Sequence, residues 1–281
     1  MRFKPLALLV AALAAFAANS LLCRLALGGN TIDPASFTSI RLLAGALTLG
    51  LLAGFRGNWA WLRAGGWGPA VALAAYAAPF SFAYLRLSAA TGALILFAAV
   101  QAAMLGWAIA TGERLVGRQW AGLAIAIGGL VYLLLPGVAA PPLTSAMLMA
   151  AAGAAWGWYS LAGRDAPDPL GATASNFIRA LPLALLVSAL TWSGQQTSTE
   201  GIVLAATSGA IASGLGYAVW YLALRHITTG SAAAAQLAVP ALAAWGGVVL
   251  LEEPLTIRLI IAAALILGGV GLALSGRAGR S

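Results

Sequence analysis

The sequence predicts an all-α integral membrane protein whose ten transmembrane helices form two inverted five-helix repeats, with both termini in the cytoplasm. Three observations predict this fold class. Of the 281 residues, 62% are apolar and only 8% are charged, whereas soluble domains carry about 25% charged residues. Apolar stretches long enough to span a bilayer recur along the whole chain. The two halves of the chain also share residues at a constant offset.

The predicted helices are apolar stretches that lie between turn-forming or charged residues. A helix needs roughly 20 mostly apolar residues to cross about 30 Å of hydrocarbon. The segments that meet this requirement are residues 5–27, 36–54, 67–85, 89–111, 118–135, 143–163, 171–192, 201–224, 228–251 and 255–275. Only Arg86-Leu87-Ser88 separate the third from the fourth, so nine helices are the alternative. The basic start of the first segment resembles a signal peptide, but an internal copy later in the chain favours a permanent helix.

Lysine and arginine residues predict the orientation, because cytoplasmic loops carry an excess of them. With the N-terminus in the cytoplasm, the basic residues on that side are Arg2, Lys4, Arg56, Arg63, Arg114, Arg118, Arg164, Arg225, Arg277 and Arg280. Only Arg24, Arg86 and Arg258 fall outside. This bias places both termini inside, as an even number of helices requires. The scattered basic residues do not form the patch that a nucleic-acid-binding surface would need.

The internal repeat divides the chain into residues 1–138 and 139–281. The matched residues include Glu113 with Glu253, Arg118 with Arg258, Gly128-Gly129 with Gly268-Gly269, Ser20 with Ser160, and Arg24 with Arg164, each pair 140 residues apart. Five helices in each half force the second copy into the membrane upside down. Inverted repeats are typical of secondary transporters, whose solute site lies near the midplane between the halves.

The sequence offers little for catalysis, metal binding or a cofactor, so we expect none of these. Cys23 is the only cysteine and His226 the only histidine, which excludes a cysteine-based metal site. A membrane-embedded enzyme, the remote alternative, would need paired carboxylates or another catalytic pair at shared depth. All seven acidic residues lie at helix ends or in loops. We therefore expect facilitated diffusion or exchange rather than proton coupling through a buried carboxylate.

Polar and aromatic residues deep in the predicted helices are the candidates for the solute path. The amides are Asn19, Gln101, Asn176 and Gln236, and the aromatic residues are Tyr76, Phe80, Phe97, Trp156, Trp158, Tyr159, Tyr217, Trp220 and Tyr221. Pro79 and Pro240 are possible hinges, because a proline removes a backbone hydrogen bond. For each amide, bonding between helices is the alternative role. Amides combined with aromatic faces suit an uncharged or zwitterionic solute with an apolar side chain. A phosphorylated solute would need several central cations.

Several residues within or beside the helices are expected to be structural. Arg41 and Arg179 are expected to snorkel from helix ends, with carboxylate binding as the lesser alternative. Glu113 and Glu253, at the start of the last helix of each repeat, are expected to cap backbone N–H groups. The glycine pairs Gly50/Gly54 and Gly153/Gly157 are expected to permit close helix packing.

One motif occurs in both halves of the chain. Gly112-Glu113-Arg114-Leu115, followed by Arg118 and Gly128-Gly129, recurs as Leu251-Glu252-Glu253-Pro254-Leu255, followed by Arg258 and Gly268-Gly269. It resembles the Glu-marked hairpin that ends each repeat of the EamA family, in the drug/metabolite transporter superfamily. Trp156-Gly157-Trp158-Tyr159-Ser160 resembles the Trp-rich start of that family's second repeat. Pro34 followed by Arg41 resembles the start of its second helix, whereas Phe16-Ala17-Ala18-Asn19 departs from the usual Trp-Gly-x-Asn.

The resemblance covers essentially the whole chain and carries further expectations. It implies ten helices, inverted repeats and transport of amino acids or related metabolites, often outward, across the bacterial cytoplasmic (inner) membrane. Within the family, the chain looks most like the YddG-type exporters of aromatic and other amino acids. The expected partners are an amino-acid solute and the lipid bilayer, and the protein is expected to be a monomer or a weak dimer. A nucleotide-sugar or sugar-phosphate carrier of the same superfamily is the alternative.

Overall fold

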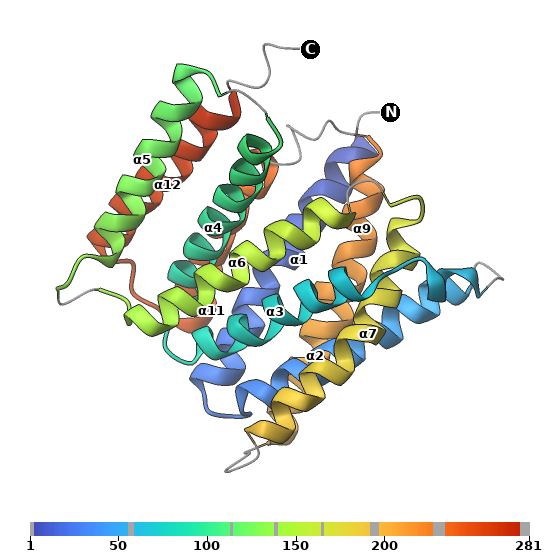
Figure 1. The fold of residues 1–281 in the computed structure, drawn as a ribbon. Helices are drawn as coiled ribbons and strands as arrows, with labels where there is room; N and C mark the ends of the chain where they lie inside the picture. Colours follow the sequence, from blue (N-terminus) through green and yellow to red (C-terminus); the bar gives the residue numbers. More distant parts are fainter. Residues whose placement is uncertain are drawn as a thin grey trace.

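The computed structural model describes residues 3–55, 59–112, 115–137, 140–163, 166–191, 197–226 and 234–275. The helices in these ranges are α1 (Phe3–Gly28), α2 (Pro34–Gly54), the 3-10 helix η1 (Ala60–Arg63), α3 (Trp67–Tyr84), α4 (Ala89–Ala110), α5 (Gly117–Leu134), α6 (Leu143–Gly163), α7 (Pro169–Leu190), α8 (Thr199–Thr207), the π-helix η2 (Ser208–Leu215), α9 (Gly216–Leu224), α11 (Ala238–Leu251) and α12 (Ile257–Ser275) (Figure 1). Within these residues the only β contact is an isolated bridge between Ile32 and Thr197. The predicted all-α class is confirmed for this part of the chain.

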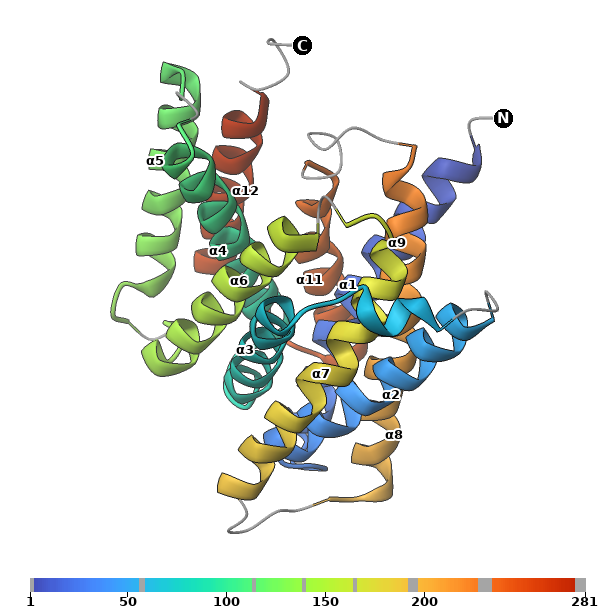
Figure 2. The same ribbon diagram turned by 45° about the vertical axis from the view of Figure 1, so that its right-hand side comes forward.

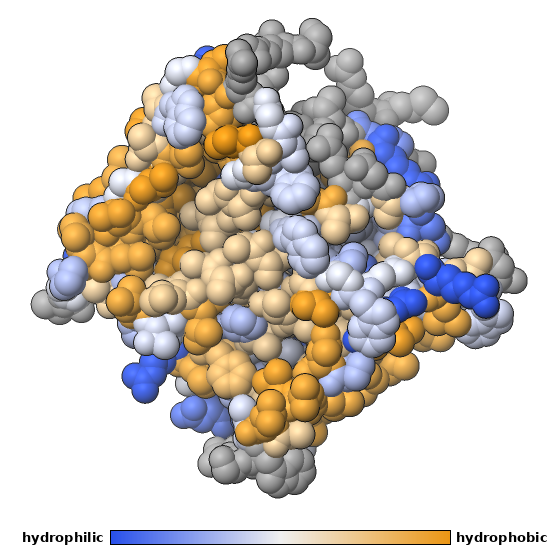
Figure 3. Space-filling model, viewed as in Figure 1, coloured by the Kyte–Doolittle hydropathy of each residue, from blue (hydrophilic) through white to orange (hydrophobic). Residues whose placement is uncertain are grey.

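Eight helices within the described residues are long and apolar enough to cross a membrane. The protein is therefore a multi-pass membrane protein, as the composition predicts. Helices α3 and α6 are the two predicted spans outside this set; α3 carries Tyr and Pro residues and α6 carries Trp and Tyr. The prediction of ten crossings stays a prediction. Large apolar side chains lie on the outer surfaces of α5 and α7, among them Val131 and Leu190, and Figure 3 shows broad apolar areas over these helices.

Two predicted helix starts lie too far along the chain. α2 begins at Pro34 rather than at residue 36, and α7 begins at Pro169 rather than at residue 171. In each case an aspartate precedes the proline. Asp33 Oδ1 accepts hydrogen bonds from two backbone N–H groups of the first turn of α2, and Asp168 accepts one in α7. Proline is favoured as the first helical residue because its missing N–H would have no partner there. The proline therefore belongs to the helix rather than to the loop.

Helices α3 and α4 are separate, which argues against the alternative in which they merge. The backbone N–H groups of Arg86 and Leu87 both bond to the carbonyl oxygen of Ala83, which closes a tight turn. The Ser88 hydroxyl then accepts the N–H of Thr91 and caps α4. A single serine cap thus replaces a loop.

The predicted helix at residues 201–224 contains a long π-helical segment. α8, η2 and α9 follow one another without a break, and the backbone of residues 208–215 has the wider π-helical turn. This segment is Ser-Gly-Ala-Ile-Ala-Ser-Gly-Leu, and it packs closely on α2: a Cβ on Gly209 would lie 2.2 Å from the carbonyl oxygen of Arg41. π-helical turns occur frequently at functional sites.

The helices pack in pairs. α5 packs on α12, α3 on α6, and α2 on α7, and α1 lies against both α9 and α11. α5 and α12 stand side by side at one edge of the molecule in both ribbon views (Figure 1; Figure 2). α1 begins and α12 ends at the same end of the molecule (Figure 1). The buried polar residues described below lie between these helix pairs.

The glycine predictions are half right. Gly153 and Gly157 of α6 lie directly against α4, since a Cβ on Gly153 would lie 2.4 Å from the carbonyl oxygen of Leu96. Gly50 and Gly54 do not permit a close helix contact: Gly54 has open space, and the nearest atom to a Cβ on Gly50 is Cη2 of Trp61, 3.5 Å away. The i, i+4 spacing of small residues alone does not tell which face meets a helix and which meets lipid.

Substitution of Gly269 tests the packing of α5 on α12. A Cβ on Gly269 would lie 2.6 Å from the backbone nitrogen of Ala126, whereas a Cβ on Gly268 would meet open space. We expect Gly269→Leu to lower the apparent melting temperature of the purified protein in detergent, because overpacking typically costs about 1–3 kcal/mol. Gly268→Leu is the matched control and should melt near the wild type. Equal melting temperatures for the two variants would contradict this packing.

Candidate functional site

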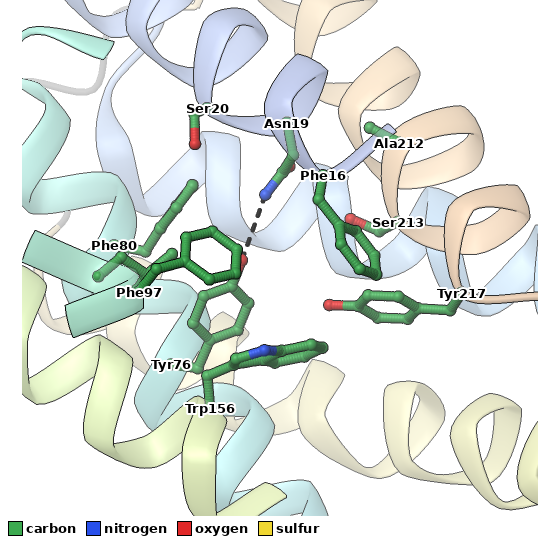
Figure 4. Close-up of a pocket in the computed structure, with 11 residues that line it drawn as sticks. Phe16, Asn19, Ser20, Tyr76, Phe80, Phe97, Trp156, Ala212, Ser213 and Tyr217 are labelled. Carbon is green, nitrogen blue, oxygen red and sulfur yellow. Dashed lines mark hydrogen bonds between the residues drawn. The ribbon is translucent and has the colours of Figure 1, made fainter. Parts of the chain in front are cut away.

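A small cavity lies among α1, α3, α4, α6, η2 and α9. Its lining residues are Phe16, Asn19, Ser20, Tyr76, Phe80, Leu96, Phe97, Trp156, Ala212, Ser213 and Tyr217, most of which are labelled in Figure 4. The cavity measures about 20 Å³, and a single water molecule needs roughly 10–15 Å³ by this measure. The space is therefore far smaller than an amino acid.

Helical spacing places the lining residues on one face of each helix. Phe16, Asn19 and Ser20 of α1 are three and four residues apart, and Tyr76 and Phe80 of α3 are four apart. Residues at these spacings lie one above the other on a helix surface. Each helix therefore contributes a short stripe, and the cavity lies where the stripes converge.

Aromatic rings form most of the wall. Trp156 stacks on Tyr217, with ring centroids 5.1 Å apart and an interplanar angle of 24°. The ring of Tyr76 lies 5.0 Å from Trp156, and the edge of Phe16 meets Tyr217 at 5.8 Å. Figure 4 shows the rings of Trp156, Tyr76 and Tyr217 gathered around the open space. Flat faces of this kind stack on aromatic groups and attract cations.

A hydrogen-bonded network crosses one side of the cavity. The Asn19 side-chain amide donates to the Tyr76 hydroxyl at 3.2 Å, the bond drawn in Figure 4. The Ser208 hydroxyl donates to Asn19 Oδ1 at 2.6 Å. Arg41 donates from Nη2 to the Tyr76 hydroxyl at 3.0 Å and from Nε to the Ser213 hydroxyl at 3.2 Å. These bonds join α1, α2, α3 and η2 through five side chains.

The expectation that Arg41 snorkels is wrong. Its side chain is 1% exposed and therefore lies fully inside the protein. The guanidinium carbon lies 5.2 Å from the ring centre of Tyr76 and 5.0 Å from that of Phe80. Small residues of η2 leave room for the arginine, and the hydroxyls of Tyr76 and Ser213 replace part of its hydration. No carboxylate pairs with Arg41 in the part of the chain that the structure describes.

Arg179 has the structural role that the sequence predicts. It donates from Nη2 to the carbonyl oxygen of Leu62 at 3.0 Å, and from Nη1 to Ser175. It therefore holds the short helix η1 against α7, away from the cavity.

Six of the sequence-predicted path residues line the cavity: Asn19, Tyr76, Phe80, Phe97, Trp156 and Tyr217. Tyr159 and Trp220 lie directly behind them, since Tyr159 stacks on Trp156 and Trp220 meets the edge of Phe16. Tyr221 accepts a hydrogen bond from the Thr173 hydroxyl at 3.3 Å.

The remaining candidates lie elsewhere. Asn176 accepts the backbone N–H of Gly66 and so fixes the start of α3. Trp158 is 43% exposed and touches neither the cavity nor its aromatic wall. Gln101 is buried one turn beyond Phe97, with no partner for its Nε2, and Gln236 is half-buried just before α11.

The two predicted hinges lie inside helices. Pro79 is within α3, between the cavity residues Tyr76 and Phe80, and Pro240 is the third residue of α11. Pro182 lies inside α7 as well, which the sequence reasoning overlooked. The hinge role itself stays a prediction.

Sequence reasoning missed several lining residues, namely Phe16, Ser20, Leu96, Ala212 and Ser213, and the role of Arg41 beside them. Phe16 and Ser20 could have been found, because they share a helix face with Asn19. Ala212 and Ser213 carry no such signal, because the π-helical turn of η2 changes the spacing that decides which side chains face inward.

An ion pair connects distant segments of the chain one helical turn from the cavity. Arg24, four residues after Ser20 on α1, donates from Nε to Glu253 Oε1 at 2.8 Å. The other carboxylate oxygen of Glu253 accepts the backbone N–H of Ala89 at 2.8 Å. Arg24 also donates to the carbonyl oxygen of Tyr84 at 3.2 Å. We call these contacts the Arg24–Glu253 latch; it ties α1 to the α3–α4 turn and to the segment between α11 and α12.

The capping prediction for Glu253 is correct in its chemistry and wrong in its helix. Glu253 caps the start of α4 rather than the start of α12, because the chain between α11 and α12 folds back toward the α3–α4 turn. Glu113 lies outside the described residues.

Comparison with known proteins agrees with this membrane fold. The sequence model of the EamA-like transporter family matches residues 143–275. The uncharacterized protein PA1977 of Pseudomonas aeruginosa is 50% identical over 279 residues, which cover 99% of this chain and 97% of that protein. Residues 143–275 of the chain belong to the EamA-like transporter family. A solved structure titled "Crystal structure of protein" shares the fold, with a TM-score of 0.65 at 24% identity over 97% of this chain and 99% of that one.

Membership of the EamA-like family makes the protein a membrane transporter. The matched residues 143–275 begin with α6 and end with α12, so they contain Trp156, Ser213 and Tyr217 of the cavity and Glu253 of the latch. The first-half residues Asn19, Arg41 and Tyr76 complete the site. Both halves of this EamA-family transporter therefore build one cavity.

Neutralising Glu253 tests the latch. We expect Glu253→Gln to lower the apparent melting temperature of the purified protein by a few degrees, because Arg24 loses its partner. The carboxylate is 12% exposed and the arginine 27%, and hydrogen bonds to charged groups contribute about 1.5–3 kcal/mol.

Glu252→Gln is the matched control for the latch, because the neighbouring Glu252 side chain is exposed. It should melt like the wild type. If both variants melted like the wild type, the latch would have no stabilising role.

Proposed function

We propose that this EamA-family transporter exports aromatic and other neutral amino acids across the bacterial cytoplasmic membrane by alternating access. The observation that carries the proposal is the cavity between the two halves, with an aromatic wall on one side and hydrogen-bonding groups on the other. Such a wall suits the apolar side chain of an amino acid, and the polar side suits its backbone groups. Sites of this kind combine apolar walls with a few placed polar groups.

The helix contacts support two inverted five-helix repeats, divided at residues 138 and 139. In this arrangement residues 199–224 of the second half correspond to α3 of the first, α11 corresponds to α4, and α6 corresponds to α1. Each contact between two helices should then have an equivalent contact between their two counterparts. α3 packs on α6 as α9 packs on α1, and α4 packs on α6 as α11 packs on α1. The α5–α12 pair is symmetric in the same way. Gly129 contacts Ile266 and Gly269 contacts Ala126, and Gly129 and Ala126 each precede their counterparts, Gly269 and Ile266, by 140 residues. Two five-helix repeats would give ten crossings with both termini on one side of the membrane, and the excess of basic residues supports the cytoplasmic side.

The composition of the cavity supports facilitated diffusion or exchange. None of its lining residues is a carboxylate, and proton coupling through a buried carboxylate would need one. The alternative solute, a nucleotide-sugar or sugar phosphate, would need several cations. Arg41 is the only fully buried charged side chain among the described residues, which favours a solute with one negative charge.

Transport by purified protein in liposomes tests the proposal. We expect counterflow of labelled phenylalanine and leucine. Unlabelled aromatic amino acids should reduce this counterflow by competition, and a pH gradient should not change it. Trp156→Ala should reduce this flux at least several-fold, because the ring forms the floor on which Tyr76, Tyr159 and Tyr217 pack. Trp107→Ala, an exposed residue of α4, is the control and should transport normally.

Two results would count against the proposal. Flux of sugar phosphates without flux of amino acids would show that the solute is a sugar phosphate rather than an amino acid. A strict requirement for a proton gradient would replace the facilitated mechanism.

A further inference from the structure

We propose that Arg41 and the Tyr76 hydroxyl form an anion-binding subsite that holds the carboxylate of the solute, so that the carboxylate rather than the ammonium group decides recognition. The inference rests on the proposed function, because it assigns a chemical task to one part of the same cavity. It depends on three observations: an uncompensated buried charge, an unpartnered donor, and a hydroxyl whose proton is free.

The charge of Arg41 is buried without a counterion. An arginine inside a membrane protein is costly unless it is paired or faces a cavity, and it marks a functional site by default. Arg41 has two hydroxyl partners and two aromatic faces, but no acidic partner within the ranges that the structure describes. A bound anion would supply the missing negative charge.

The guanidinium also has unused donors. Its Nε and Nη2 each donate one hydrogen bond, whereas Nη1 is buried and has no partner among the residues that the structure describes. A guanidinium carries five N–H groups in a planar fork that matches a carboxylate. Buried donors are rarely left unsatisfied, and each exception calls for an explanation. A carboxylate bound in the cavity would accept from this donor.

The Tyr76 hydroxyl connects the Arg41 guanidinium to the cavity surface. Its hydroxyl accepts one hydrogen bond from Arg41 and one from Asn19. Among the described residues no acceptor takes its own proton, and Tyr76 lines the cavity. A hydroxyl that accepts from two donors becomes a better donor itself. A carboxylate oxygen in the cavity would accept this proton, and the second oxygen would accept from Arg41.

The opening of the cavity exposes Arg41. The two residues that accept its hydrogen bonds, Tyr76 of α3 and Ser213 of η2, both line the cavity. A movement that separates α3 from η2 therefore enlarges the cavity and uncovers Nη1 in one step. The aromatic wall formed by Trp156, Phe97 and Tyr217 then faces the apolar side chain of the solute.

The ammonium group has no comparable partner. The lining residues offer hydroxyls, aromatic faces and the Asn19 amide, whose oxygen already accepts from Ser208, but no carboxylate. This asymmetry makes a prediction that amino-acid transport alone does not make. A solute that lacks the ammonium group should still bind, and a solute that lacks the carboxylate should not.

Competition against counterflow of labelled phenylalanine by the wild-type protein tests this order. We expect 3-phenylpropionate to compete, and phenylalaninamide and phenethylamine to compete at least about tenfold more weakly, as the loss of a charged hydrogen bond implies. Equal competition by phenylalanine and phenylalaninamide would overturn the subsite and leave amino-acid transport standing. Binding of 3-phenylpropionate without binding of any amino acid, measured by thermal shift, would overturn the proposed function and leave the subsite standing. Tighter binding of phenyl phosphate than of 3-phenylpropionate would overturn the assignment to a carboxylate.

Variants then assign the preference to Arg41. Arg41→Gln should abolish the preference for 3-phenylpropionate over phenylalaninamide, and Arg41→Lys should retain part of it because the charge remains. Arg179→Gln, which removes a helical arginine that bonds only to Leu62 and Ser175, should retain the wild-type preference. Size-exclusion chromatography and melting temperature check that each variant is folded. A folded Arg41→Gln protein with the wild-type preference would overturn the assignment, and if that variant does not fold, the wild-type competition series decides.

Discussion

The burial of the Arg41 guanidinium is the constraint on which the centre of the molecule depends. A cation removed from water needs hydrogen-bond acceptors, and here they come from two other elements, Tyr76 of α3 and Ser213 of η2. These bonds fix the distance between α2, α3 and η2. Asn19 then extends the network to α1 through the same tyrosine hydroxyl. One charge on α2 thus positions α1, α3 and η2, three of the elements that surround the cavity, and the aromatic wall packs around them.

Close helix packing makes this burial possible. A Cβ on Gly209 would lie only 2.2 Å from the carbonyl oxygen of Arg41. The helices α2 and η2 therefore approach with almost no side chain between them. Water cannot enter such a contact, and the guanidinium is left with protein hydroxyls and aromatic rings. In lipid there is little hydrophobic drive between helices, so contacts of this closeness provide much of the association. The same kind of contact joins Gly122 to Gly269 in the α5–α12 pair.

The sequence predicts the helices well and the site in part, for physical reasons that differ. Apolar length decides where a helix lies in a membrane, so the predicted helix at residues 89–111 agrees closely with α4, Ala89–Ala110. The stripe of Tyr76 and Phe80 was accessible from helical spacing. Arg41 was not, because a residue's depth depends on neighbours such as Gly209 that come from a distant part of the chain. The π-helical turn of η2 likewise hides Ser213 from any analysis that assumes 3.6 residues per turn.

The two ends of the cavity differ, and the difference bears on how it opens. At one end the Arg24–Glu253 latch satisfies two charges and a backbone N–H at once, so opening there breaks several strong contacts together. At the other end, one turn beyond Phe97, Gln101 Nε2 is buried without a partner among the residues that the structure describes. Polar atoms in this condition gain hydrogen bonds when water or a solute reaches them. Opening from the Gln101 end is therefore opposed less than opening from the latch end, and a solute that fills the cavity from that side meets the aromatic wall before it reaches Arg41.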